Sequence, residues 1–316
     1  MTTGGGAGDR LREAESMLRA ACGARLRTSF PLAALTTFRI GGPAALYLEA
    51  ESDADLMAAS LAVQATGVPW TIIGKGSNIL VSDVGFEGLV LRLGRGYRWA
   101  ARDGVRLHAG GAMPLPALSG IALAHGLAGL EFGVAIPASL GGAVRMNAGA
   151  HGRSMEEVLE SIDIYSIASN TPSRVPVREA GFSYRRSSLP EGSVVVGASV
   201  GLRPGDRQGI RRGMDDARNW RRATQPLAEP NCGSVFKNPP GDHAARLVEA
   251  IGGKGLSVGN ASVSTKHANF IVAKAGARAI DVRDLIGLLQ QRIEDQFGIS
   301  LEPEVQLVGD FERQRL

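Results

Sequence analysis

Glycine gathers at the ends of apolar segments in this chain, and this placement constrains the fold more than any other sequence feature. Among 42 glycines in 316 residues, close pairs occur at Gly41-Gly42, Gly74 and Gly76, Gly110-Gly111, Gly141-Gly142 and Gly252-Gly253. Glycine accepts positive φ angles and lets a backbone approach a ligand closely. The clusters therefore favour loops that hold a ligand, although ordinary turns explain some of them equally well.

The rest of the composition is that of a soluble globular chain. Hydrophobic residues make up 44% and charged residues 21% of the sequence, which excludes a wholly disordered, collagen-like or coiled-coil protein. The net charge is only +4, from 35 basic and 31 acidic side chains, so we expect no nucleic acid as a partner. An aromatic content of 5% also argues against a stacking platform for single-stranded nucleic acid.

Cysteine and histidine give no reason to expect a metal. The cysteines, Cys22 and Cys232, are too few and too far apart for a disulfide scaffold or a structural zinc site. The five histidines show no ligand spacing. No run of about twenty apolar residues is present, and residues 1–10 lack an apolar signal-peptide stretch. We therefore expect a cytoplasmic protein without membrane insertion.

The first part of the chain alternates helix-type and strand-type segments. After a disordered tail at residues 1–8, the patterns predict helices at 9–22 and 52–67 and strands at 43–49, 70–73 and 89–93. Ser52 begins the second helix with Asp55 three residues on, as in a capping box. This order predicts a small α/β unit.

The remainder predicts antiparallel strands followed by a second α/β segment. Asp103-Gly104 indicates a hairpin between 97–101 and 105–109. Further segments are a helix at 114–125, a Gly/Ala-rich loop at 132–152 and strands at 162–167, 174–177 and 193–202. After a break at Pro204-Gly205, the patterns predict helices at 206–222, 243–251 and 280–297 and strands at 269–273 and 305–308. The fold class is therefore expected to be α+β.

Two glycine-rich segments are candidates for holding a ligand. Gly74-Lys75-Gly76-Ser77-Asn78 follows an apolar strand, where successive N–H groups would suit a pyrophosphate. It is not a Rossmann fingerprint, and alone it is equally typical of a turn. Residues 136–143 and 147–150 are rich in small side chains, which suit a flat ligand or a helix packed closely on a sheet.

Three polar segments are candidates for chemistry. Arg185, next to Tyr184, could clamp a carboxylate or simply end a basic strand. Ser234, in Cys-Gly-Ser-Val-Phe-Lys-Asn-Pro, could protonate a developing carbanion. A Ser-His-Asp hydrolase is the rival hypothesis, but the chain lacks the Gly-x-Ser-x-Gly elbow. Glu304 enters an apolar strand, where an unpaired carboxylate is costly.

In this order, the five segments resemble the UDP-N-acetylenolpyruvoylglucosamine reductase family. The similarity begins at Thr36-Thr37-Phe38-Arg39-Ile40-Gly41-Gly42 and ends at Glu304-Val305. Tyr-Arg-x-Ser, Gly-Ser-Val-Phe-Lys-Asn-Pro and Leu-Glu-Pro-Glu-Val in series are highly specific, whereas Gly-x-Gly-Ser-Asn alone is weak. No insert follows Tyr184-Arg185, which is typical of the shorter of the family's two subtypes.

The resemblance implies a two-part FAD-binding domain of the vanillyl-alcohol-oxidase (PCMH) type and a C-terminal α/β substrate-binding domain, not a Rossmann fold. We expect the FAD-binding subdomains at residues 9–93 and 94–205 and the substrate-binding domain at 206–316. FAD would be bound non-covalently. The residues implied to hold it are Arg39, Ile40, Gly41, Gly42, Gly74, Lys75, Gly76, Ser77, Asn78, Ile136, Pro137, Ala138, Ser139, Gly141, Gly142, Ala143, Asn147, Ala148 and Gly149.

The resemblance also implies the reaction. Hydride would pass from NADPH to flavin N5 and then to the enolpyruvyl group of UDP-N-acetylenolpyruvoylglucosamine, giving UDP-N-acetylmuramate for peptidoglycan. Ser234 would supply the proton, while Arg185 and Glu304 would stabilise the enolate-like intermediate. Weaker candidates for substrate contacts are Tyr184, Asn238, Lys266 and Asn269.

Some features leave alternatives open. His151 stands where the family usually has Tyr, and it either replaces a hydrogen bond or faces solvent. Arg221 and Arg222 could meet the substrate diphosphate or form a solvated helix end. The alternative functions are a flavin oxidase or dehydrogenase of the same fold and a non-catalytic flavin or nucleotide-sugar binding protein. We expect a monomer, with a weak homo-oligomer as the alternative.

Overall fold

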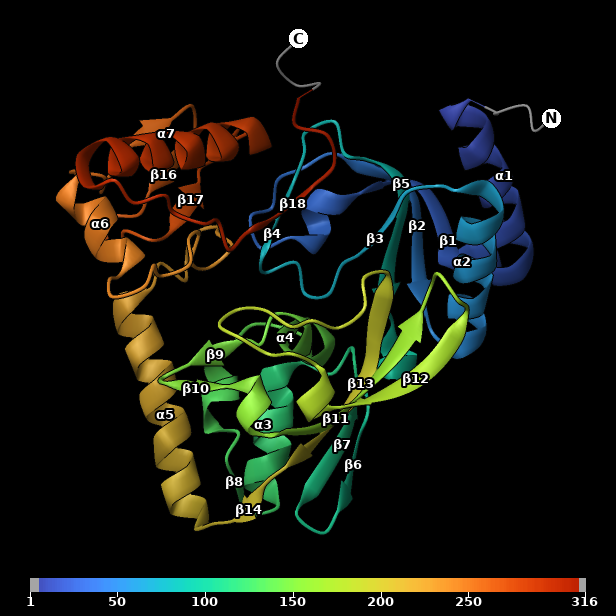
Figure 1. Ribbon diagram of the computed structural model, residues 1–316, viewed down its shortest axis with the longest axis horizontal. Helices are drawn as coiled ribbons and strands as arrows, with labels where there is room; N and C mark the ends of the chain where they lie inside the picture. Colours follow the sequence, from blue (N-terminus) through green and yellow to red (C-terminus); the bar gives the residue numbers. More distant parts are fainter. Residues whose placement is uncertain (1–5, 313–316) are drawn as a thin grey trace. The chain divides into compact units, whose positions relative to one another are not determined.

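The computed structural model describes residues 6–312, and within them the α+β class is confirmed (Figure 1). The helices are α1 (Ala7–Cys22), α2 (Asp53–Thr66), α3 (Leu115–Ala124), α4 (Leu140–Arg145), α5 (Arg207–Thr224), α6 (Ala244–Ala250) and α7 (Ala279–Phe297). The strands of the first half are β1 (Leu26–Pro31), β2 (Pro43–Ala50), β3 (Trp70–Ile72), β4 (Ile79–Val81), β5 (Phe86–Leu93), β6 (Ala100–Asp103), β7 (Arg106–Gly110), β8 (Leu127–Ala128), β9 (Gly149–Ala150) and β10 (Arg153–Ser154). The later strands are β11 (Leu159–Ser166), β12 (Thr171–Pro176), β13 (Ser193–Gly201), β14 (Arg203–Pro204), β15 (Ser257–Val258), β16 (Ala261–Val263), β17 (Ile271–Ala273) and β18 (Gln306–Val308).

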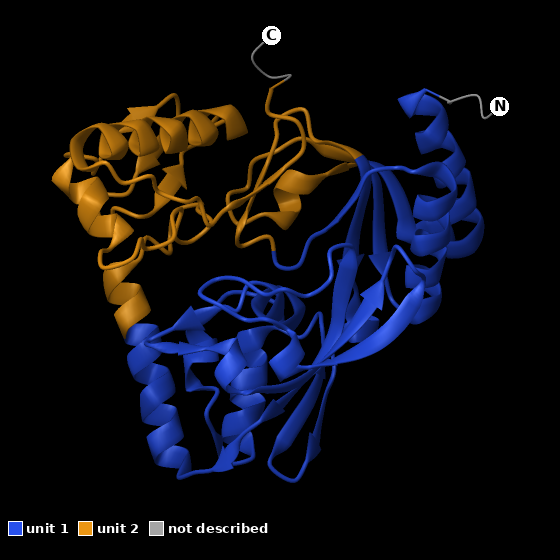
Figure 2. Cartoon of the chain, viewed as in Figure 1, with its two compact units in different colours: residues 1–29, 45–75, 88–219 blue, residues 30–44, 76–87, 220–316 orange. Residues whose placement is uncertain are grey.

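The chain forms two compact units, each assembled from separate stretches of sequence (Figure 2). Unit 1 comprises residues 1–29, 45–75 and 88–219, and unit 2 comprises residues 30–44, 76–87 and 220–316. The three-part division expected from the sequence stays a prediction. Of the expected tail at residues 1–8, residues 1–5 lie outside the described residues, and α1 already begins at Ala7.

Unit 1 contains the larger sheets. A four-stranded sheet has the order β1-β2-β5-β3, with β3 parallel to β5. Its apolar side chains pack with those of α1 and α2 in one core. The capping box predicted at Ser52 is not formed, because the Ser52 hydroxyl accepts from no helix N–H and instead donates to Asp55 Oδ2 at 3.4 Å. The same carboxylate accepts from the Glu51 N–H at 2.8 Å.

The second sheet of unit 1 is antiparallel, in the order β12-β11-β13-β7-β6. The predicted Asp103-Gly104 hairpin joins β6 and β7. A separate core lies between this sheet and the α3 and α4 segments. The expected loop at 132–152 is wrong in part, because α4 occupies Leu140–Arg145 with Ser139 as its N-cap.

Unit 2 is built around α7. The buried face of this helix packs on α6, β16, β17 and the side chains of Phe38 and Leu80, which come from the two early stretches of the unit. β15, β16 and β17 form a small antiparallel sheet, and β18 pairs in parallel with β4. No helix among residues 6–312 has the length and apolar content needed to cross a membrane.

Candidate functional site

The glycine loop after β3 presents free main-chain donors. Residues 74–78 form a series of bends, and none of their N–H groups donates to an acceptor within the described residues. Clustered free N–H groups on a glycine-rich turn are the donor set that a phosphate or pyrophosphate requires. These free donors are of the kind that the expected diphosphate would need, and the role of the loop in binding FAD stays a prediction.

Gly74 and Ser139 bring two predicted flavin segments together in unit 1. A Cβ at Gly74 would lie 2.6 Å from Ser139 Oγ, which is closer than two such atoms can approach. Ser139 is buried and accepts a hydrogen bond from the Gly142 N–H at 3.4 Å, so its hydroxyl also caps α4. The absence of a side chain at Gly74 therefore permits this contact.

In unit 2, Gly76 packs against the segment that leads to the Arg39–Gly42 motif. Its φ is +62°, and a Cβ would lie 1.9 Å from the carbonyl oxygen of Leu35. The Thr37 N–H and hydroxyl both donate to the Gly76 carbonyl, at 2.9 and 3.2 Å. These contacts fix the second half of the glycine loop to its neighbour in this unit.

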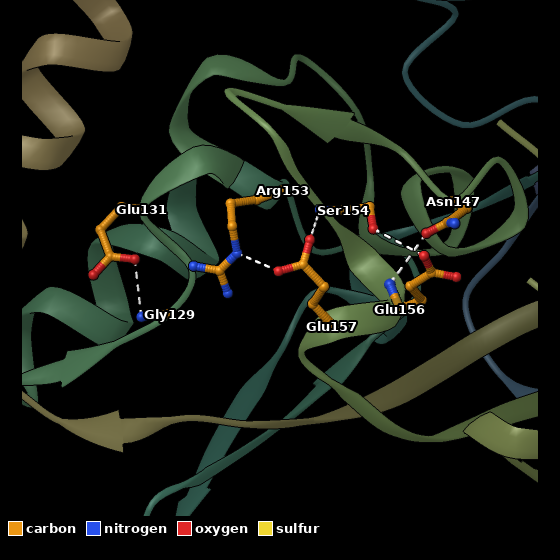
Figure 3. Close-up of polar contacts among 7 residues, drawn as sticks. All are labelled: Gly129, Glu131, Asn147, Arg153, Ser154, Glu156 and Glu157. Atoms are coloured by element: carbon orange, nitrogen blue, oxygen red, sulfur yellow. Dashed lines mark hydrogen bonds and ion pairs between the residues drawn. The ribbon is translucent and has the colours of Figure 1, made fainter. Parts of the chain in front are cut away.

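Asn147 links two loops of unit 1, and its contact with Glu156 is drawn in Figure 3. It is buried with φ of +41°. Its Nδ2 donates to the Ser183 carbonyl at 3.0 Å, and its Oδ1 accepts from the Glu156 N–H at 3.1 Å. Beside it, Glu157 accepts from the Ser154 N–H at 2.8 Å and pairs with Arg153. The small-residue segment is therefore tied to the loop that carries Arg185.

Arg185 lies at the tip of a tight turn in that loop. Ser183 and Arg186 close the turn with reciprocal main-chain hydrogen bonds of 3.0 and 3.1 Å, and Arg185 has φ of +55°. Its Nη2 donates to the Gly149 carbonyl at 2.8 Å. The guanidinium lies 5.1 Å from the centre of the exposed Tyr184 ring. The structure thus brings Arg185, Asn147 and Gly149 together.

His151 follows in the same small-residue segment. It is exposed and has φ of +54°. Both alternatives for His151, a replaced hydrogen bond and a side chain that faces solvent, stay predictions.

Ser234 and Glu304 are brought together in unit 2 through Val235. The Glu304 N–H donates to the Val235 carbonyl at 2.7 Å, and the Val235 N–H donates to the Asn269 carbonyl at 2.9 Å. The half-buried Ser234 hydroxyl makes no hydrogen bond to another residue within 6–312. A serine held on a fixed backbone with a free hydroxyl can donate to a bound molecule.

Asn78 connects the glycine loop to Glu304. Its Nδ2 donates to the Glu304 carbonyl at 3.0 Å, and its own carbonyl accepts from the Gln306 N–H at 3.0 Å. The Glu304 carboxylate also lies close enough to Cys232 to act on it. Burial raises the pKa of the Cys232 thiol, and Glu304 raises it further when its carboxylate is ionised, so this cysteine stays protonated.

The weaker substrate candidates have intramolecular partners and stay predictions. The Asn238 side chain accepts from the Ala244 N–H at 3.1 Å, and the Lys266 ammonium donates to the Arg222 carbonyl. Asn269 is buried and uses its whole side-chain amide on the Phe236 backbone. A positioning role for Asn269 was missed, because nothing in the sequence near it indicates where Phe236 lies.

Comparison with known proteins identifies the domain types in this chain. A family model described as the C-terminal domain of UDP-N-acetylenolpyruvoylglucosamine reductase matches residues 225–308, and an FAD-binding domain model matches residues 44–171. These matches concern whole domains and say nothing of the role of any single residue.

Two similar relatives are named UDP-N-acetylenolpyruvoylglucosamine reductase. One, from Heliobacterium modesticaldum, is 44% identical over 89% of this chain and 90% of its own. The other, from an Anaeromyxobacter species, is 46% identical over 90% of this chain and 89% of its own.

A solved structure of UDP-N-acetylenolpyruvylglucosamine reductase (MurB) from Thermus caldophilus matches with a TM-score of 0.78 and 34% identity. The match covers 90% of this chain and 99% of that one. The fold is therefore the expected α+β architecture with an FAD-binding domain of the vanillyl-alcohol-oxidase type, and it is not a Rossmann fold.

Proposed function

This chain belongs to the UDP-N-acetylenolpyruvoylglucosamine reductase family, and from that membership we propose which of its residues carry the reaction. The protein is an FAD-dependent oxidoreductase that reduces UDP-N-acetylenolpyruvoylglucosamine to UDP-N-acetylmuramate for peptidoglycan, with NADPH as co-substrate. The assignment of roles rests mainly on one observation, the hydrogen bond from the Glu304 N–H to the Val235 carbonyl. This bond holds the Ser234 loop beside Glu304.

Ser234 supplies the proton in this proposal. When bound, FAD supplies the hydride that reaches the terminal carbon of the enolpyruvyl double bond. The two π electrons then reside on the neighbouring carbon and its carboxylate. A serine hydroxyl is a weak acid, so it can protonate that carbon only because the transition state makes the carbon strongly basic. Ser234 regains its proton from solvent, which balances the step.

Arg185 and Glu304 stabilise the charge that precedes protonation. A guanidinium presents paired donors that match a carboxylate, so Arg185 would bind the substrate carboxylate as negative charge develops on it. Glu304 in its protonated form would donate a hydrogen bond to the same enolate-like group. Fixed donors aimed at developing charge lower the barrier without needing to reorganise.

The FAD-holding residues are proposed from the donor set of the glycine loop and from its neighbours. Gly74 to Asn78 would bind the diphosphate with their free N–H groups, and Asn147 to Gly149 would lie against the flavin. Since the substrates are a nucleotide sugar and a nicotinamide nucleotide, we place the reaction in the cytoplasm. We keep the expectation of a monomer, which sedimentation would test.

An anaerobic absorption spectrum of the purified protein tests the proposal. NADPH should bleach the flavin bands, and UDP-N-acetylenolpyruvoylglucosamine should restore them. Bands that return only with oxygen would favour an oxidase of the same fold. A protein that holds flavin and the nucleotide sugar but transfers no electrons would be a non-catalytic binding protein.

A further inference from the structure

Arg145 forms the densest set of polar contacts around the loop that carries Arg185. It is the last residue of α4 and is partly buried. Nη1 donates to the carbonyl oxygens of Leu189 and Pro190 at 3.0 and 3.3 Å. Nη2 donates to the Ser193 carbonyl and, at 2.9 Å, to the Ser193 hydroxyl. These acceptors all lie in the part of the loop that follows Arg185 in the sequence.

The main chain of Arg145 also contacts this part of the loop, at a position nearer to the turn. The Ser187 hydroxyl donates to the Arg145 carbonyl at 2.7 Å. Ser187 directly follows Arg186, which closes the tight turn around Arg185. Arg145 therefore fixes the segment 187–193, and all of these contacts lie within unit 1.

The acceptors around Arg145 are neutral. Within residues 6–312, no carboxylate forms an ion pair with it, and burial lowers the pKa of its guanidinium. A partly buried cation that donates only to carbonyl and hydroxyl oxygens is costly to replace, because those oxygens would lose their donors. A cation of this kind serves to fix the chain around it rather than to neutralise a charge.

We propose that Arg145 is a positioning residue for Arg185, setting the place of the guanidinium that meets the substrate carboxylate. This inference rests on the role proposed above for Arg185. Arg145 ends α4, and the other end of this helix begins after Ser139, which lies beside Gly74. Arg145 thus belongs to the same short helix as a predicted flavin-lining segment, but its side chain serves the substrate half of the reaction.

Arg145→Met tests the inference in the holoenzyme, with the two half-reactions followed separately by anaerobic rapid mixing. We expect flavin reduction by NADPH to stay within about twofold of wild type, and reoxidation by UDP-N-acetylenolpyruvoylglucosamine to slow by about tenfold or more. Arg106→Met, a variant of an exposed arginine paired with Glu160 on the sheet, is the matched control and should change neither rate. Equal slowing of both half-reactions, or of neither, would overturn the inference.

A double-mutant cycle separates positioning from general damage. If Arg145 acts through Arg185, then adding Arg145→Met to Arg185→Met should cause no further slowing of reoxidation. Independent, multiplicative losses would contradict the proposal. Should Arg145→Met fail to fold, Arg145→Lys and Ser187→Ala carry the same cycle with smaller losses. If wild-type protein itself is not reoxidised by the nucleotide sugar, the proposed function fails and not the link between Arg145 and Arg185.

Discussion

Asn269 hydrogen-bonds both main-chain polar groups of Phe236 with its side-chain amide. Oδ1 accepts from the Phe236 N–H at 2.9 Å, and Nδ2 donates to the Phe236 carbonyl at 2.8 Å. Both side chains are buried, so water cannot replace these bonds. The amide therefore substitutes for a neighbouring strand and fixes the backbone two residues after Ser234.

Asn269→Ala should lower the free energy of unfolding by about 2–4 kcal/mol, because two buried backbone groups lose their partners. Urea denaturation monitored by circular dichroism would measure this. Asn238→Ala removes the single, part-buried hydrogen bond that the exposed Asn238 accepts from the Ala244 N–H, and it should cost about 1 kcal/mol or less. Similar losses in the two variants would contradict the role given to Asn269.

Ser234→Ala should leave flavin reduction by NADPH unchanged and slow reoxidation by the enolpyruvyl substrate by about 100-fold or more. The reason is that only the second half-reaction needs a proton on carbon. Anaerobic stopped-flow absorption would resolve the two steps. Ser173→Ala, at an exposed position on β12, is the control. Loss of both steps to the same extent would show that Ser234 is not the proton donor.

Gly76→Ala should be far more damaging than Gly104→Ala, although both glycines have φ near +60°. The left-handed conformation alone costs about 1–2 kcal/mol for a residue with a Cβ. At Gly104 a Cβ meets nothing within 4 Å, whereas at Gly76 it would lie 1.9 Å from the Leu35 carbonyl. Flavin retained after gel filtration and thermal unfolding would show the difference. Equal behaviour of the two variants would mean that the contact with Leu35 is dispensable.

Asp55→Asn should destabilise the protein at neutral pH and less so in acid. Burial of Asp55 favours the neutral form, but the Glu51 N–H and the Arg25 guanidinium outweigh it, and the pKa falls below its ordinary value of 3.8. A carboxyl of this kind stabilises the fold above its unfolded pKa and loses that contribution as the pH falls through its folded pKa. Urea unfolding between pH 7 and pH 3 should show the gap to wild type narrowing below about pH 4. Asp103→Asn, in the exposed hairpin, should change the free energy of unfolding by less than about 0.5 kcal/mol at pH 7. A constant gap for Asp55→Asn would refute the ion-pair explanation.

Local signals predicted most of the elements. The second and last long helices end at Gly67 and Gly298, both left-handed, as a glycine stop requires. The hairpin at Asp103-Gly104 likewise follows from turn chemistry alone. Helix α4 lies in a segment expected to be a loop, although a helix packed closely on a sheet was the alternative for residues 136–143. Gly141 and Gly142 weaken the helical pattern there, so the sequence could not decide between the two.

The site was predictable only as separate segments. The sequence singled out Ser234 and Glu304, but nothing local shows that Val235 and Glu304 share a hydrogen bond. Arg145 was not singled out at all, since its acceptors lie more than forty positions away and are backbone oxygens, which every residue has. Hydrogen bonds to distant backbone oxygens therefore cannot be predicted from the types of residue in the sequence.

The parallel pairing of β18 with β4 has a consequence for how the chain folds during its translation. Residues 79–81 leave the ribosome long before residues 306–308 exist to pair with them. Unit 1 also needs its last stretch, residues 88–219, but that stretch is translated before most of unit 2. Unit 1 can therefore fold first. The hydrogen bond from Asn78 to the Glu304 carbonyl can form only after residue 304 has been translated. We therefore expect the glycine loop, which we propose to bind the flavin diphosphate, to be completed only near the end of translation, as one of the last folding events.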